Sequence, residues 1–278
     1  MANDWTLTID VGAGQVSTDY STWANVVTAI NADKANMLYC KIKQNGSPAT
    51  LPTTFYELFL SATKVEEIVF EDVDTSSVST MARMFRYCSS LETLNVNCWE
   101  TGGVDNFQYI FDGCSSIVTL NLNHFDVSKA STSIGISGAF RNCSKLVYLN
   151  VNDWNTENVI GLWSTFMGCS SLSELNLNGW NTEKVYNMDH LFSGCSNLKT
   201  IYVGDGWSID SVTNGTGTFV SCASLVGAIA YDPTKTDYTW ANWVTGYLTY
   251  GTPPSPSKVK SINRVYRMNS PHQVRRMN

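Results

Sequence analysis

Residues 166–192 read FMGCSSLSELNLNGWNTEKVYNMDHLF, and variants of this stretch recur along most of the chain. Six cysteines mark the repeat at spacings of 26, 29, 26, 26 and 27 residues: Cys88, Cys114, Cys143, Cys169, Cys195 and Cys222. A phenylalanine stands three residues before each cysteine, and an aliphatic residue stands three residues after it. Because self-similarity at a fixed period is typical of stacked repeats, the sequence predicts a solenoid.

Each repeat unit combines a predicted strand with a predicted helix. Leu172, Leu175 and Leu177 follow the pattern L-x-x-L-x-L, whose last residues form a strand in leucine-rich repeats. A second apolar series follows at i, i+3, i+6 and i+7, which indicates one face of a short helix (Val185, Met188, Leu191 and Phe192). One coil cannot bury both faces alone, so neighbours must stack. The expected fold class is an α/β solenoid, a leucine-rich-repeat-like stack of strand–helix coils with N- and C-terminal caps.

The limits of the repeat suggest five segments. Residues 1–54 are expected to form an N-terminal cap, with strands in WTLTIDV and MLYCKIK and a helix near STWANVVTAI. The repeats occupy residues 55–224, and residues 225–250 form a C-terminal cap in which Trp240, Trp243 and Tyr247 cover the last open face. Capping is needed because an open solenoid end exposes apolar surface. The remaining segments are a Pro/Ser linker over 251–257 and a basic tail over 258–278.

The chain has eight cysteines, which raises the question of disulfides or a metal site. A zinc site would use two pairs at C-x₂₋₄-C spacing, and the sequence lacks them. One cysteine per coil, repeated along the stack, gives no unique disulfide pairing. Free cysteine packs as a small apolar residue, so we expect a column of buried, reduced thiols and no metal or other cofactor.

Asparagines form two columns on the predicted outward side of the strands, because alternate side chains of a strand point to opposite faces. The candidate binding residues of this face are Asn95, Asn121, Asn150 and Asn176 in one column, Asn97, Asn123, Asn152 and Asn178 in the other, and the neighbouring Tyr148. Such a flat polar face could bind a host-surface protein or a glycan. The alternative is an amide ladder whose members hydrogen-bond one another and bind nothing.

The net charge of −6 conceals a strong asymmetry. Residues 1–257 hold 12 basic and 24 acidic residues, a net charge of −12, whereas residues 258–278 carry +6 and no acid. The candidate attachment residues of this tail are Lys258, Lys260, Arg264, Tyr266, Arg267, Arg275 and Arg276. One interpretation is a solvated chain end, and the other is a peptide that docks on an acidic protein partner. Nucleic acid is disfavoured as a partner because the folded part is acidic.

The segments MFRYCSSLETLNVNCWETGGV, FMGCSSLSELNLNGWNTEKV and LFSGCSNLKTIYVGDGW resemble the BspA-like leucine-rich repeats. The resemblance extends over about residues 55–230 and rests on F-x-x-C-x-x-L, L-x-L-x-x-W-x-T and V-x-x-M-x-x-M-F. It implies a solenoid with a role in adhesion or protein binding on bacterial, protist or phage-borne surfaces, and it implies no catalytic residues.

Enzymatic function is not expected from this sequence. Charged residues are only 15% of the chain, and the three histidines lack an independent nucleophile, since Cys195 near His190 belongs to the repeat. The segment VGAGQVSTD lacks the lysine of a phosphate-binding loop. The sequence shows no export signal. It also has no apolar stretch approaching the ~20 residues that span a membrane, so no membrane partner is expected. These features together favour a structural protein on a phage virion surface, with a bacterial cell-surface adhesin or an intracellular protein-binding scaffold as alternatives.

Overall fold

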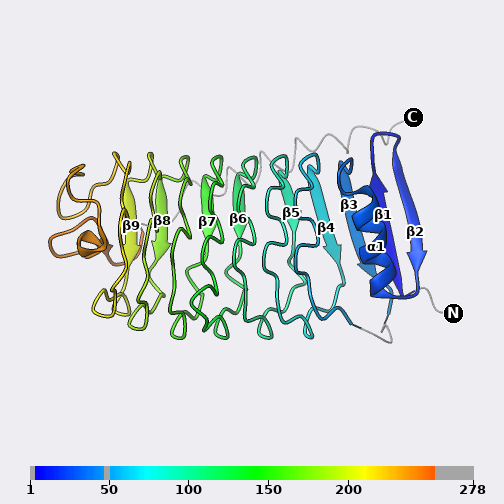
Figure 1. Cartoon of the computed structure of the whole chain (residues 1–278), viewed down its shortest axis with the longest axis horizontal. Helices are drawn as coiled ribbons and strands as arrows, with labels where there is room; N and C mark the ends of the chain where they lie inside the picture. Colours follow the sequence, from blue (N-terminus) through cyan, green and yellow to red (C-terminus); the bar gives the residue numbers. More distant parts are fainter. Residues whose placement is uncertain (1–3, 47–50, 254–278) are drawn as a thin grey trace.

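The chain forms an elongated β-solenoid of about six turns, seen from the side in Figure 1. The structure, a computed structural model, describes residues 4–46 and 51–253. Successive coils stack along one axis, so strands that are neighbours in the stack are about one repeat apart in the sequence. The solenoid expected from the cysteine spacing is therefore confirmed.

The N-terminal end of the stack contains two strands, a helix and a third strand. These are β1 (Trp5–Asp10), β2 (Gln15–Tyr20), α1 (Trp23–Asp33) and β3 (Tyr39–Gln44). Thr22 begins α1 by accepting the Asn25 amide on its side chain, as an N-cap residue does. Strand β1 pairs antiparallel with both β2 and β3, and the buried Trp5 and Trp23 rings lie 5.2 Å apart. The expected strands and helix are present, and β2 is an additional strand.

The later strands belong to the coils and run parallel to their neighbours. They are β4 (Glu67–Glu71), β5 (Thr93–Asn95), β6 (Thr119–Asn121), β7 (Tyr148–Asn150), β8 (Glu174–Leu177), β9 (Thr200–Val203) and β10 (Thr249–Tyr250). The pairing keeps equivalent repeat positions in register, so that Leu120 lies opposite Leu149 and Asn121 opposite Asn150. Inward residues such as Leu175 and Leu177 are buried, as the alternation predicted.

The α/β class and the strand–helix coils predicted from the sequence are wrong. Besides α1, the described residues contain only the one-turn 3₁₀ helix η1 (Tyr238–Trp240). The segment predicted as a helix around Val185–Phe192 is a series of turns. Its apolar residues are nevertheless buried, so the spacing identified the inward residues but not the backbone conformation.

Alternating hydrogen bonds explain why these segments are not helical. The amides of His190 and Phe192 donate to Thr216 and Thr218 of the next coil, at 3.0 and 2.9 Å. The intervening amide of Leu191 donates to Met188 three residues back, at 3.1 Å. His190 also has a φ of +55°, outside the right-handed helical region. The bonds between coils replace those of a helix because the stacked neighbour supplies carbonyl groups in register.

Aromatic rings form two continuous columns in the core. Phe166 lies between Phe140 and Phe192 with ring centroids 5.8 and 5.7 Å away and nearly parallel planes. Beside it, Trp154 and Trp180 stack at 6.0 Å, and Trp180 donates its indole N–H to the Val151 carbonyl at 2.9 Å. All of these rings are buried. Because buried aromatic side chains contribute strongly to the energy of a core, we expect these columns to be a main source of the stability of the stack.

The repeat cysteines form a column of buried free thiols, as expected, and each one has a hydrogen-bond acceptor. Cys169 donates its S–H to the Phe140 carbonyl of the preceding coil at 3.1 Å. The other five repeat thiols make the equivalent contact at 3.0–3.2 Å, to the carbonyls of Phe59, Phe85, Phe111, Phe166 and Phe192. The cysteine is therefore both a small core residue and a link between coils.

In four coils a buried threonine two residues after the tryptophan position makes a further link. Thr182 donates its hydroxyl to the Ser208 carbonyl at 2.7 Å and accepts the Ser208 amide at 2.7 Å. The same reciprocal pair recurs between Thr75 and Glu100, Thr101 and Asp126, and Thr156 and Asn181. These pairs satisfy the polar groups of the loops that leave the sheet.

The C-terminal end of the stack is covered by aromatic residues. Tyr247 is fully buried, and its ring meets that of Phe219, the last phenylalanine of the column, at 5.1 Å. Trp240 packs beside Tyr247 at 6.3 Å. The basic tail, with its candidate attachment residues, lies outside the described residues.

Candidate functional site

The outward side chains of β4–β9, here called the sheet face, contain the asparagine columns. Asn121 and Asn150 are opposite one another in the β6–β7 pair, and Thr119 lies opposite Tyr148. Asn95 and Asn121 are exposed, whereas Asn150 and Asn176 are half-buried. The structure therefore pairs Asn121 with Asn150, and Asn95 and Asn176 lie on β5 and β8, where they pair with Val69 and Tyr202.

The amide ladder considered as an alternative forms at one step of the first column. Asn150 donates its amide to the Asn121 side-chain oxygen at 2.9 Å. Asn95 and Asn176 instead accept backbone amides two residues ahead, at 3.2 and 3.1 Å, and so hold the turn that ends each strand.

The second column has different partners. Asn123 and Asn152 both donate to the Asp153 carboxylate, at 3.4 and 2.8 Å. Neither column is a continuous chain of amides. Asn97 and Asn178 take part through their backbone amides, which donate to Asn95 and Asn176.

The sheet face changes character towards the N-terminal end. Glu71 of β4 pairs with both Lys41 and Lys43 of β3. These ion pairs lower the pKa of Glu71 to about 2, with the hydrogen bond from Lys41 as the largest cause. Near the middle of the face, burial raises the pKa of the half-buried Tyr148 phenol. The strands β5–β7 carry no charged residue, whereas Glu174 is exposed at the start of β8.

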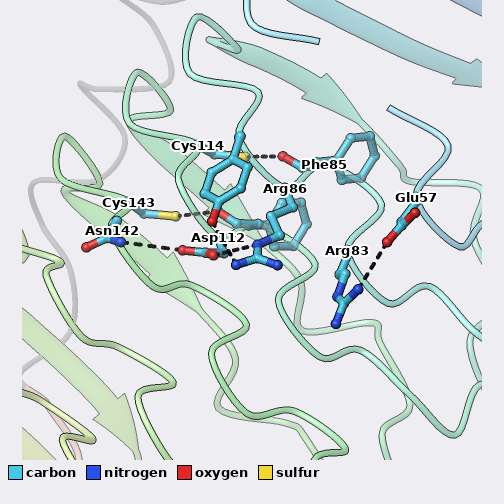
Figure 2. A network of polar contacts seen from close by, with 10 residues as sticks. Glu57, Arg83, Phe85, Arg86, Asp112, Cys114, Asn142 and Cys143 are labelled. Carbon is cyan, nitrogen blue, oxygen red and sulfur yellow. Dashed lines mark hydrogen bonds and ion pairs between the residues drawn. The ribbon is translucent and has the colours of Figure 1, made fainter. Parts of the chain in front are cut away.

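The opposite side of the solenoid, here called the turn face, holds a cluster that sequence analysis missed (Figure 2). All three arginines of residues 1–257 lie there: Arg83, Arg86 and Arg141. Arg83 pairs with Glu57 at 3.1 Å, and Arg86 pairs with Asp112 at 2.9 Å. Each pair joins adjacent coils. The sequence did contain a signal for this cluster, since the three arginines all lie between a repeat phenylalanine and the following cysteine or just before them. That segment was predicted to be the exposed surface of a helix, where arginine is common.

Asp112 is the buried centre of this cluster. Its carboxylate accepts the Arg86 guanidinium and, at 3.5 Å, the Asn142 amide. Burial raises the pKa of Asp112 despite the opposing effect of Arg86. The Arg86 guanidinium lies over the rings of Tyr87 and Tyr109, at 4.6 and 4.5 Å from their centroids. A buried carboxylate with an arginine held between two rings is a rigid cross-link between coils.

The repeats of this solenoid match a known protein family. A family model described as "Mycoplasma protein of unknown function, DUF285" matches residues 53–136 and 134–246. The chain belongs to this family. The match is consistent with a BspA-like repeat protein. A comparison with curated proteins gave no match.

The family match spans the coils from the first phenylalanine of the column to the C-terminal aromatic cover. A DUF285 chain folded as a repeat solenoid fits a repeat-type surface or binding protein. Within residues 4–46 and 51–253, no helix has the length and apolar character needed to cross a membrane.

Proposed function

We propose that this DUF285 protein is a non-enzymatic binding protein whose sheet face contacts a protein or glycan on a host surface. The observation that carries the proposal is the register of Asn121, Asn150 and Asn176, which repeats amide groups along one face of a rigid stack. Repeated polar groups on a solenoid are the usual basis of an extended binding surface. The nearest candidates for catalysis are engaged elsewhere, since Cys195 donates to Phe166 and His190 bonds the Thr216 carbonyl.

For the setting we propose a phage virion, with the chain as an accessory capsid-, fibre- or tail-associated protein anchored through its basic tail to an acidic virion or assembly protein. The support is the set of eight free cysteines, seven of them buried. Free thiols in such number favour folding in a reducing compartment, and virion proteins fold in the cytosol before lysis releases them. The alternative proposals are a bacterial cell-surface adhesin of the BspA-like type and an intracellular protein-binding scaffold.

Replacing Asn121, Asn150 and Asn176 together by alanine is expected to weaken binding to host cells or to a glycan array by about tenfold or more. Three outward amides would be lost, and each hydrogen bond contributes roughly 0.5–1.5 kcal/mol. Binding is measured with the purified full chain, and the melting temperature of the variant is recorded in parallel.

Thr213→Ala, Thr216→Ala and Asn197→Ala, combined in one chain, form a matched control, because these polar residues are exposed away from the asparagine columns. Unchanged binding by the asparagine variant, with unchanged melting, rejects the sheet face as the binding surface. Loss of binding by the control variant, with normal binding by the asparagine variant, would also reject the sheet face as the binding surface.

Deleting residues 258–278 is expected to abolish incorporation into particles while the solenoid stays folded, because the tail carries the positive charge proposed to meet an acidic partner. Incorporation is measured by quantifying the chain in purified virions, and folding by circular dichroism. A charge-neutral tail, with glutamine at its six basic positions, separates the contribution of charge from that of length. Normal incorporation of the truncated chain contradicts attachment through the tail.

A further inference from the structure

A groove of about 550 Å³ lies where the last repeat coil meets the C-terminal cover. This C-terminal groove is lined by Glu183, Asp205, Trp207, Ser208, Ile209 and Asp210 from the repeat and by Ala241, Asn242, Trp243 and Val244 from the cover. Its volume is in the range of roughly 300–1,000 Å³ typical of ligand sites. Neither the asparagine columns nor the arginine cluster contributes a residue to it.

The groove is negatively charged and contains no basic lining residue. Among the described residues, no ion pair joins Glu183, Asp205 or Asp210 to a cation. The adjacent Lys184 donates instead to Asn158 of the preceding coil, at 2.9 Å. Asp205 accepts the Tyr250 hydroxyl, which positions one of its two oxygens and leaves the other available. A cation would therefore find three carboxylates that no basic side chain of the described residues already neutralises.

The groove also has an apolar and aromatic wall. Trp243 is half-buried, and its ring lies 5.5 Å from that of Tyr250. Val244 is 74% exposed, the largest value among the exposed bulky apolar side chains of the described chain. An indole face beside carboxylates suits arginine, whose planar guanidinium stacks on aromatic rings and pairs with carboxylates at the same time. The wall and the charge together fit a basic peptide with apolar residues between its arginines.

A peptide of this chemistry begins a few residues from the groove. Strand β10 ends at Tyr250, which contacts Asp205, and the described chain ends at Pro253. Lys258 is five residues further on, and an extended chain of that length spans about 17 Å. The tail contains RVYRMN and QVRRMN, in which the arginines are flanked by Val and Met and, in the first, also by Tyr. A tethered peptide has an effective concentration of about millimolar, so even weak contacts are populated.

We propose that the C-terminal groove is a binding site for an arginine-containing peptide, and that its occupant is the basic segment 258–278 of the same chain. An arginine stacks on Trp243 beside Val244, and the carboxylates of Glu183, Asp205 and Asp210 neutralise the basic groups. The contact is intramolecular and competes with any acidic partner for the tail. It does not depend on what the sheet face binds.

Carbodiimide cross-linking of the full chain tests this contact. The reagent joins a lysine amine directly to a carboxylate when the two groups are in contact. We expect cross-links from Lys258 or Lys260 to Glu183, Asp205 or Asp210, found by peptide mapping of the monomer band and lost at 0.5 M salt, about threefold above physiological ionic strength. Val244→Arg adds a positive charge at an exposed position and no new lysine. It should lower the cross-link yield about tenfold, a change equivalent to 1.4 kcal/mol.

Val220→Arg is the matched control, since Val220 is also exposed but lies on the turn face. Trp243→Ala is a second test that keeps every carboxylate, and circular dichroism checks that each variant is folded. Equal yields in Val244→Arg, Trp243→Ala and wild type overturn the proposal. So do cross-links spread evenly over carboxylates of earlier coils, which indicate unspecific attraction, and cross-links found only in dimers, which indicate docking between two copies.

Discussion

Raising the pH from 8 to 10 is expected to lower the free energy of unfolding of the chain by about 9–10 kcal/mol, because seven buried thiols, the six of the repeat and Cys40, keep their protons in the folded state. Burial raises the pKa of Cys88 and Cys222 from 9.0 to about 12 and raises the pKa of Cys40 and of the other four repeat thiols in the same direction. In the unfolded chain the thiols ionise near 9.0. Above that pH the folded state binds more protons than the unfolded state, so stability falls as pH rises.

The size of the effect follows from the number of thiols. Each thiol contributes about 1.4 kcal/mol between pH 8 and pH 10, since one pH unit beyond the unfolded pKa is worth 1.36 kcal/mol. The urea midpoint, measured at pH 8, 9 and 10 in the presence of a reductant, gives the slope. Cys169→Ala should reduce that slope by about one proton, whereas Cys98→Ala should reduce it less because Cys98 is only half-buried. A midpoint that does not move between pH 8 and pH 10 contradicts the buried thiol column.

Phe166→Ala is expected to lower the free energy of unfolding by about 3–5 kcal/mol, the usual cost of truncating a buried phenylalanine. Phe166 has no exposed surface and touches three rings, those of Phe140, Phe192 and Trp180. The cavity would interrupt the aromatic column in the middle of the stack. Because each coil is stabilised by its neighbours, the two halves should then unfold at different urea concentrations.

Urea unfolding followed by circular dichroism and by tryptophan fluorescence measures this change. Val147→Ala serves as the control, since Val147 belongs to an adjacent coil but is 41% exposed, and its midpoint should shift little. Phe166→Leu should fall between the two variants because it retains most of the apolar volume. If Phe166→Ala and Val147→Ala shift the midpoint equally, the aromatic column is not a main source of stability.

The sequence predicted the register of the solenoid well because each buried position is set by a local pattern. The phenylalanine before each cysteine and the aliphatic residue after it are inward in the structure, and Asn121 and Asn150 are paired across coils as the repeat implied. The same pattern misassigned the backbone after each tryptophan position. Apolar residues at i, i+3 and i+6 fit both a helix face and a series of three-residue turns, and hydrophobic spacing alone does not separate the two.

The candidate binding surfaces also differ in whether a local sequence pattern could reveal them. The asparagine columns could be found from alternation within a strand. The arginine cluster around Asp112 could not, since Arg86, Asp112 and Asn142 are 26 and 30 residues apart and meet only after the coils stack. The C-terminal groove likewise joins Asp205 and Trp243, which no local spacing relates.

The sequence by itself determined which residues face the core, because the apolar Phe, Cys and Leu positions recur with a period of about 26 residues. It also determined that successive coils must stack, since one coil alone leaves these residues exposed. Only the tertiary structure decided the backbone between them. An amide can bond within its own turn or to the neighbouring coil, and the choice depends on the carbonyl groups that the neighbour presents. Here the amides of His190 and Phe192 donate to the next coil, so hydrogen bonds between coils take the place of a helix.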